Sequence, residues 1–248
     1  MLFLYNVLPG HDFGIAIIIF TVILKTIQIP VSKKQIESQK KMQEFQPKIK
    51  ELKNKYKNDK ERQTKETMKL YKENHINPLS GCLPIIVQMV FLFIIYRVIY
   101  NISKSGFIVD PNDIYRFVEN PGQINNMFLG FIDLSRSIDI KNITLSSIPT
   151  IILVIISAIF QYFQTKMMMA KQLITANKSN NMDFAQIMSK QMLFIGPLMT
   201  LYIGTILPAG LALYWLISTL FAIGQQMYME KKLPFFQKPL NTIIVPKK

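Results

Sequence analysis

The sequence predicts an all-α membrane protein with five transmembrane helices. Half of the 248 residues are hydrophobic, and the mean hydropathy is positive. The hydrophobic residues gather into separate blocks, whereas a soluble domain spreads them along each helix or strand with a short period. Basic residues are concentrated in particular segments between these blocks. The blocks and the charges are independent observations, and both predict an odd number of crossings.

Four hydrophobic blocks define the predicted spans. They cover residues 14–29, 83–100, 148–163 and 192–223. Because a helix needs about 20 residues to cross the hydrocarbon core, the last block is long enough to hold two spans. The Leu-Pro-Ala-Gly sequence at 207–210 supplies the turn between them. With their flanks, the five predicted spans are residues 14–30, 80–100, 148–166, 191–206 and 207–228.

Charge predicts which side of the membrane each connecting segment occupies, because cytoplasmic loops carry an excess of Lys and Arg. Segment 31–79 holds 14 basic and 7 acidic residues, whereas segment 101–147 holds 4 basic and 5 acidic ones. Residues 1–13 contain a single charge, Asp12. The net charge of +14 is therefore mostly explained by topology, with binding of nucleic acid as a second explanation. The predicted cytoplasmic segments are 31–79, 167–190 and the basic tail 229–248, and the predicted external segments are 1–13 and 101–147.

The amino-terminal segment is expected to stay on the outer surface. No Lys or Arg precedes Lys25, so a cleaved signal peptide is not expected. Residues 1–13 are apolar but interrupted by Pro9 and Gly10, which favours a short helix at the interface. A single cysteine, Cys82, excludes an internal disulfide, and the positions of the two histidines predict no metal site.

The 31–79 segment is predicted to form an antiparallel helical hairpin in the cytoplasm. In its first half, apolar residues recur at spacings of three and four, which places them on one face of a helix. Asn58 or Asp59 is positioned to cap a second helix, whose facing side would carry Met68 and Tyr71. The pattern leaves open whether the hairpin is a solvated spacer or a docking arm for a partner or an arriving chain.

Three of the predicted spans carry polar residues on one helical face. Their spacings of three, four and seven residues place them on the same side of a helix. Such residues could line one cavity, or they could form hydrogen bonds between packed helices worth about 1 kcal/mol each. The sets are Thr21, Lys25 and Gln28 in the first span, Ser157, Gln161 and Gln164 in the third, and Tyr214, Ser218 and Gln225 in the fifth, with Trp215 beside them.

Lys25 favours the cavity. An ionised lysine at mid-bilayer costs about 3 kcal/mol, so it usually pairs with an acid or faces water. No Asp or Glu occurs in any predicted span. Lys25 can then either extend its side chain to the cytoplasmic interface, about 6 Å away at Ile29, or face a wet groove. Because Thr21 continues the polar face deeper into the membrane, we expect a groove that opens to the cytoplasm.

Three long segments resemble one family of membrane proteins. HINPLSGCLPIIVQMVFLFIIYRVI at 75–99 and LPAGLALYWLISTLFAIGQQ at 207–226 are similar to the two hallmark segments of the YidC/Oxa/Alb membrane-protein insertases. Residues 42–78 resemble their cytoplasmic hairpin, and the resemblance runs in order from Gly14 to Gln226. The resemblance predicts the compact five-span form, without the extra first span and the large periplasmic domain of the Gram-negative members.

The resemblance implies a hydrophilic groove in the inner leaflet that is closed on the outer side and contains one cation. The match GIAIIIFTVILK places that cation at Lys25, where the family usually has an arginine. Positive charge is kept, but the bidentate fork of a guanidinium is lost. The resemblance also places Gln164, Tyr214 and Trp215 at substrate-facing or groove-lining positions. The complete set predicted to line the groove is Thr21, Lys25, Gln28, Ser157, Gln161, Gln164, Tyr214, Trp215 and Ser218.

The implied function is insertion and folding of membrane proteins in a bacterial cell membrane, with the amino end outside and the carboxyl end in the cytoplasm. The implied partners are nascent membrane proteins with short translocated tails, the ribosome, the Sec translocon and the lipid bilayer. No GxSxG or HExxH motif and no phosphate-binding glycine loop occurs, so we expect neither an enzyme nor a bound cofactor. A small-solute transporter or channel is the alternative, although the sequence shows no paired halves with broken helices.

Overall fold

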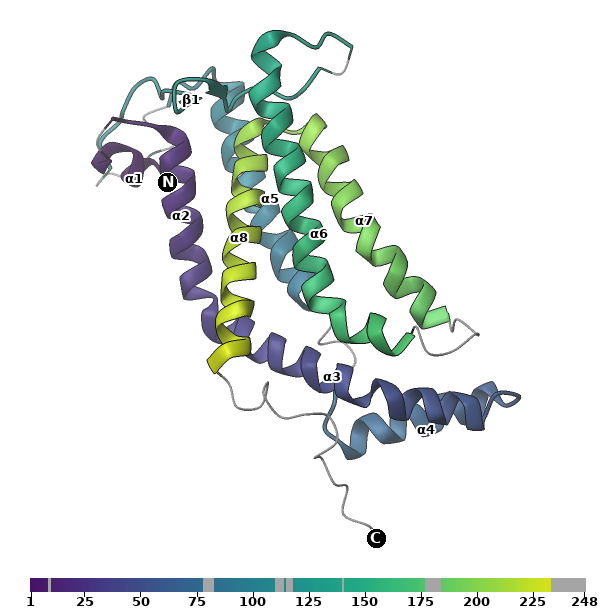
Figure 1. The fold of residues 1–248 in the computed structure, drawn as a ribbon. Helices are drawn as coiled ribbons and strands as arrows, with labels where there is room; N and C mark the ends of the chain where they lie inside the picture. Colours follow the sequence, from purple (N-terminus) through teal and green to yellow (C-terminus); the bar gives the residue numbers. More distant parts are fainter. Residues whose placement is uncertain are drawn as a thin grey trace.

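The computed structural model describes residues 1–8, 10–77, 83–109, 114, 118–139, 141–176 and 184–232. Within these residues the chain is mostly helical, as predicted, with one short antiparallel sheet (Figure 1). The elements are α1 (Leu2–Val7), α2 (Phe13–Ile27), α3 (Ile29–Lys55), α4 (Lys60–Glu73), α5 (Leu83–Lys104), β1 (Met127–Phe128), β2 (Ile132–Asp133), η3 (Leu145–Ser147), α6 (Ile148–Ala176), α7 (Phe184–Ile206) and α8 (Ala209–Lys232).

The helices α2, α5, α6, α7 and α8 form an elongated bundle, and α3 and α4 project from one end of it (Figure 1). By length and composition, Ile86–Lys104 and Leu145–Met168 are each able to cross a membrane. The bent pair α2 and α3 gives a third span if it is counted as one, and Leu193–Ile206 is apolar but shorter. Among the described residues this criterion yields two or three spans, so the count of five remains a prediction.

Some predicted features lie outside the described residues. They are Pro9, Cys82 and the other residues at the junction 78–82, residues 177–183 of the predicted cytoplasmic loop, and residues 233–248 of the predicted tail.

The start of α2 is held by the side chain of Asp12. Its Oδ1 atom accepts hydrogen bonds from the backbone N–H groups of Gly14 at 2.7 Å and Ile15 at 3.1 Å, which caps the helix. Its Oδ2 atom accepts a third bond, at 2.9 Å, from the backbone N–H of Leu129. Gly14 lies against Phe128, and a Cβ atom at position 14 would be 2.8 Å from the Phe128 Cβ. The short sheet therefore packs directly on this end of α2.

A bend of 62° separates α2 from α3 at Gln28. Pro30 explains the break, because its nitrogen carries no hydrogen and its ring crowds the carbonyl four residues earlier, at Thr26. A proline also disfavours the helical conformation at the residue that precedes it. Beyond the bend, α3 runs without a further break through Pro47 to Lys55.

α3 and α4 pack side by side as a hairpin (Figure 1). Of the two candidate caps, Asp59 is the one used, and its Oδ1 atom accepts from the backbone N–H of Arg62 at 2.9 Å. The side chain of Gln63 donates to the Lys53 carbonyl at 2.9 Å and so links the two helices.

The facing side of α4 differs from the prediction in one residue. Tyr71 is half-buried, whereas Met68 is 50% exposed, so Met68 is not buried against α3 as expected. The half-buried positions of α4 include Gln63, Thr67 and Leu70, which lie on one face of the helix. Met68 follows Thr67 directly and is therefore turned about 100° away from that face.

The tightest packing in the bundle joins α6 to α7 and α8. Gly204 of α7 allows the close approach of α6, because a Cβ atom there would be 2.7 Å from Val154 Cγ1. α2 packs mainly on α8, with Ile17 close to Gly210. α5 makes fewer contacts with α8 than α6 and α2 do.

Candidate functional site

Lys25 lies near the end of α2, and its ammonium group contacts a side chain of α5. Lys25 Nζ donates a hydrogen bond to Gln88 Oε1 at 2.9 Å. Gln88 Nε2 in turn donates to Tyr214 Oη of α8 at 3.4 Å, a long bond. Lys25 and Gln88 are half-buried, whereas Tyr214 is only 1% exposed. Two consecutive hydrogen bonds thus connect α2, α5 and α8.

The sequence predicts either the cytoplasmic interface or a wet groove as the surroundings of Lys25, and it does not predict an amide partner. Gln88 accepts a hydrogen bond from the ammonium without neutralising its charge. Gln88 is 63 residues away in the sequence. A signal for it was present, since Gln88 is the one amide side chain within the predicted second span.

A second group of polar side chains joins α6 to α8. Gln161 Oε1 accepts hydrogen bonds from Trp215 Nε1 at 3.1 Å and from Thr219 Oγ1 at 3.2 Å. Ser157 is fully buried, and its hydroxyl donates to the Leu153 carbonyl of its own helix at 2.7 Å, with the Ala212 carbonyl of α8 at 3.5 Å as a weaker second acceptor. These contacts have the form of hydrogen bonds between packed membrane helices. Thr219 was not among the predicted residues, although it lies one turn after Trp215.

The remaining predicted residues differ in burial. Thr21 is fully buried, and its hydroxyl donates to the Ile17 carbonyl of the same helix at 2.6 Å. Gln28 lies half-buried at the bend, and Gln164 is half-buried on α6. Ser218 is buried one turn after Tyr214. The structure brings Lys25 and Tyr214 together through Gln88, and it brings Gln161 and Trp215 together directly.

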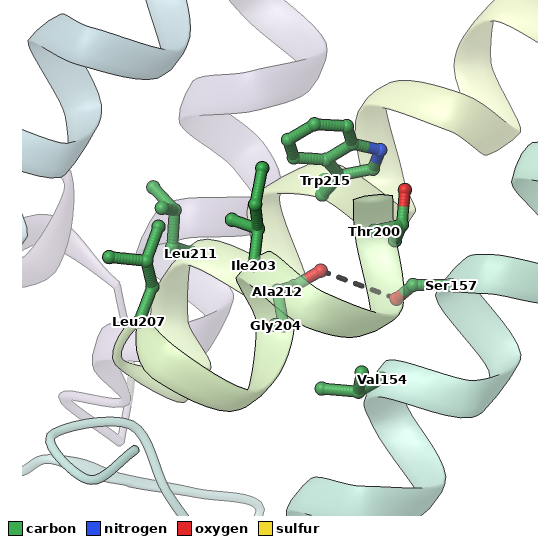
Figure 2. Close-up of a pocket in the computed structure, with 9 residues that line it drawn as sticks. All are labelled: Val154, Ser157, Thr200, Ile203, Gly204, Leu207, Leu211, Ala212 and Trp215. Carbon is green, nitrogen blue, oxygen red and sulfur yellow. Dashed lines mark hydrogen bonds between the residues drawn. The ribbon is translucent and has the colours of Figure 1, made fainter. Parts of the chain in front are cut away.

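A small, partly open cleft lies between α6, α7 and α8 (Figure 2). Two of the predicted residues, Ser157 and Trp215, are part of its wall. The Ser157 and Thr200 hydroxyls both donate to carbonyl groups of their own helices, so these hydroxyls add few free hydrogen-bond donors to the cleft. Lys25 is not among the residues of the wall, which are Val154, Ser157, Thr200, Ile203, Gly204, Leu207, Leu211, Ala212 and Trp215.

α8 therefore presents two polar faces. Tyr214 contacts Gln88 of α5, while the next residue, Trp215, contacts Gln161 of α6. Successive residues on a helix point about 100° apart, so a single helix serves both networks.

Comparison with known proteins identifies relatives along most of the chain. The model of the family described as 60Kd inner membrane protein matches residues 3–237. A protein of Fusobacterium nucleatum named Membrane protein insertase YidC is 32% identical over 222 residues, which is 89% of this chain and 87% of that protein. Membrane protein insertase YidC 2 of Bacillus anthracis is 34% identical over 226 residues, or 90% of this chain and 73% of that protein.

A longer relative, Membrane protein insertase YidC of Streptomyces avermitilis, is 31% identical over 229 residues. That match covers 91% of this chain and 53% of the relative, so this chain spans about half of that protein's length. The family match extends over nearly the whole sequence and contains both hallmark segments and the hairpin. The chain belongs to the 60Kd inner membrane protein family, the YidC/Oxa/Alb family that these segments resemble.

Proposed function

We propose that this protein is a membrane-protein insertase and chaperone that admits spans carrying short polar tails into a bacterial cell membrane. The names of its relatives support the class of activity. The observation that carries the mechanism is the position of Lys25, whose ammonium group is held within the helix bundle by a neutral amide. No Asp or Glu lies in any of the predicted spans to cancel this charge.

The energetics of insertion give Lys25 its role. Each Leu, Ile, Val or Phe at the centre of an arriving span gains roughly 0.3–0.6 kcal/mol in the bilayer, whereas a central Asp costs about 2.5–3.5 kcal/mol. The polar tail that must cross is therefore the barrier. A carboxylate about 4 Å from the ammonium gains on the order of 4 kcal/mol at an effective dielectric constant of 20. This gain offsets the cost of one acidic residue without trapping it permanently.

The proposed groove faces the cytoplasm and contains the predicted polar residues of α2, α6 and α8. The five predicted spans would surround it, with the amino end outside and the carboxyl end in the cytoplasm. The α3–α4 hairpin, with its many lysines, and the basic tail would bind ribosomes that deliver nascent membrane proteins. The Sec translocon is a second partner in this proposal, and the process needs neither a nucleotide nor a cofactor.

Reconstitution into liposomes tests this function. The substrate is a single-span protein with a short acidic tail, and its control has a neutral tail of equal length. Protease protection of the tail measures insertion by wild type and by the Lys25→Arg, Lys25→Ala and Lys25→Glu variants. We expect Lys25→Arg to keep acidic-tail insertion, Lys25→Ala to reduce it and Lys25→Glu to reduce it further.

Two results would contradict the proposal at different levels. Insertion by wild type no greater than in protein-free liposomes would exclude the insertase function. Equal insertion of acidic tails by wild type and Lys25→Glu would exclude the electrostatic role alone. The same vesicles loaded with a small solute test the alternative of a transporter or channel, for which flux through the purified protein is expected.

A further inference from the structure

Gln88 is the residue through which both hydrogen bonds of the Lys25 site pass. An ammonium group only donates hydrogen bonds, so the amide oxygen of Gln88 must face Lys25 and its NH₂ group must face Tyr214. Both ends of the amide are thus used, and its orientation is set by its two partners. Tyr214 is almost completely buried, so packing fixes the position of its phenol.

This arrangement connects a fixed group to a flexible one. A lysine side chain has a long flexible stem and tends to extend toward water. Its neighbour Gln28 lies at the bend where α2 ends, so the end of the helix is close by. The bond to Gln88 instead directs the ammonium across to α5. Without that acceptor, we expect the Lys25 side chain to extend toward the interface.

The neutrality of Gln88 matters as much as its position. A carboxylate at residue 88 would form an ion pair with Lys25 and occupy the charge permanently. An amide oxygen forms a weaker bond than a carboxylate does, so an arriving carboxylate can replace it. Gln88 is suited to hold the ammonium in place and then to release it.

We propose that Gln88 is a positioning residue for insertion, which holds the Lys25 ammonium between α2, α5 and α8 and gives it up to an acidic residue of the substrate. This inference rests on the insertase function proposed above. It assigns part of the substrate selectivity to α5, a helix on which the sequence predicted no groove residue. This selectivity distinguishes substrates with acidic tails from those with neutral tails, and it does not depend on the apolar span of the substrate.

Three variants test the inference in the full-length protein in liposomes. Gln88→Met keeps the length of the side chain but removes both hydrogen bonds, and Gln88→Glu keeps its shape but adds a fixed carboxylate. Met89→Leu is the matched control, because the neighbouring Met89 side chain is 52% exposed on the same helix. Insertion of substrates with acidic and neutral tails of equal length is measured for each variant. Resistance to protease in detergent verifies that each variant is folded.

We expect Gln88→Met to reduce acidic-tail insertion on the order of tenfold, as for loss of one hydrogen bond to a charged group, with little change for neutral tails. Gln88→Glu is expected to abolish the preference for acidic tails, and Met89→Leu to retain it. An unchanged ratio of acidic to neutral insertion in both Gln88 variants would overturn the inference, as would an equal loss for both tails. The function itself is judged separately, by wild-type insertion and by Lys25→Glu.

Discussion

Replacement of Gln161 by methionine tests whether the polar residues between α6 and α8 hold the helices together or line the proposed groove. Methionine is unbranched and similar in length, so it fills the space without forming the two hydrogen bonds. Both Trp215 Nε1 and Thr219 Oγ1 then lose their acceptor on Gln161. Hydrogen bonds between membrane helices contribute about 0.6 kcal/mol on average and up to about 1.7 kcal/mol. Loss of two such bonds should lower the free energy of unfolding by about 1–3 kcal/mol.

A double-mutant cycle isolates the indole contact. Trp215→Phe removes the N–H donor and keeps an aromatic ring, and it is combined with Gln161→Met. The free energy of unfolding is measured in bicelles for the wild type, both single variants and the double variant. Residues that share a hydrogen bond give a coupling energy of about 0.5 kcal/mol or more. Thr200→Val is the control, because the Thr200 hydroxyl donates within its own helix, to the Gly196 carbonyl at 3.1 Å.

The outcome separates the two interpretations of these residues. If they hold α6 to α8, Gln161→Met loses stability while insertion per folded molecule is retained. If Gln161 mainly lines the groove, insertion falls while the free energy of unfolding stays the same. A coupling energy below about 0.3 kcal/mol, the range of independent sites, would refute the contact between Gln161 and Trp215 as a source of stability.

Three further predictions concern the two ends of the bundle. Asp12→Ala should lower the free energy of unfolding by about 2–4 kcal/mol, because it removes a helix cap and a charged hydrogen bond. Asp12→Asn keeps one oxygen for the cap, so the loss should be roughly half as large. Denaturant titration measures both losses. Burial raises the pKa of the Tyr71 phenol above its ordinary value. The contribution of Tyr71 to hairpin stability should therefore be complete below that ordinary pKa and be lost as the pH rises through the raised pKa. Ultraviolet titration follows the ionisation of the phenol, and the Tyr71→Phe variant should lack this pH dependence of stability. Pro30→Ala restores a backbone N–H at the bend, so the angle between α2 and α3 should fall from 62°, and distances between spin labels on the two helices should lengthen.

Local signals in the sequence were sufficient to predict a mostly helical chain. The cap at Asp59 and the turn before Ala209 follow from residue types that act on their immediate neighbours. The role of Met68 was predicted incorrectly because an apolar residue at a plausible spacing need not lie on the face that the partner helix covers. The short sheet of β1 and β2 was not predicted, since strands of two residues have no periodic signal.

For the site, the sequence could predict only which residues share a helical face. Thr21 and Lys25 share a face, yet the Thr21 hydroxyl donates to its own helix while the Lys25 ammonium reaches α5. A sequence period gives the direction of a side chain from its own axis, but not which helix stands opposite. Gln88 could not be assigned to Lys25 for this reason, because the two residues are brought together only by the packing of α2 and α5 around α8.

The two polar faces of α8 suggest different mechanical roles for its neighbours. α6 packs tightly on α8, and Gln161 adds two hydrogen bonds from α6 to that interface. α5 makes fewer contacts with α8, and among the described residues these two helices are linked by the long hydrogen bond from Gln88 to Tyr214. Separation of α5 from α8 would thus break fewer contacts than separation of α6 from α8. Under the proposed function, we therefore expect an arriving segment to displace α5 first, beside the Lys25 ammonium, while α6 and α8 stay together.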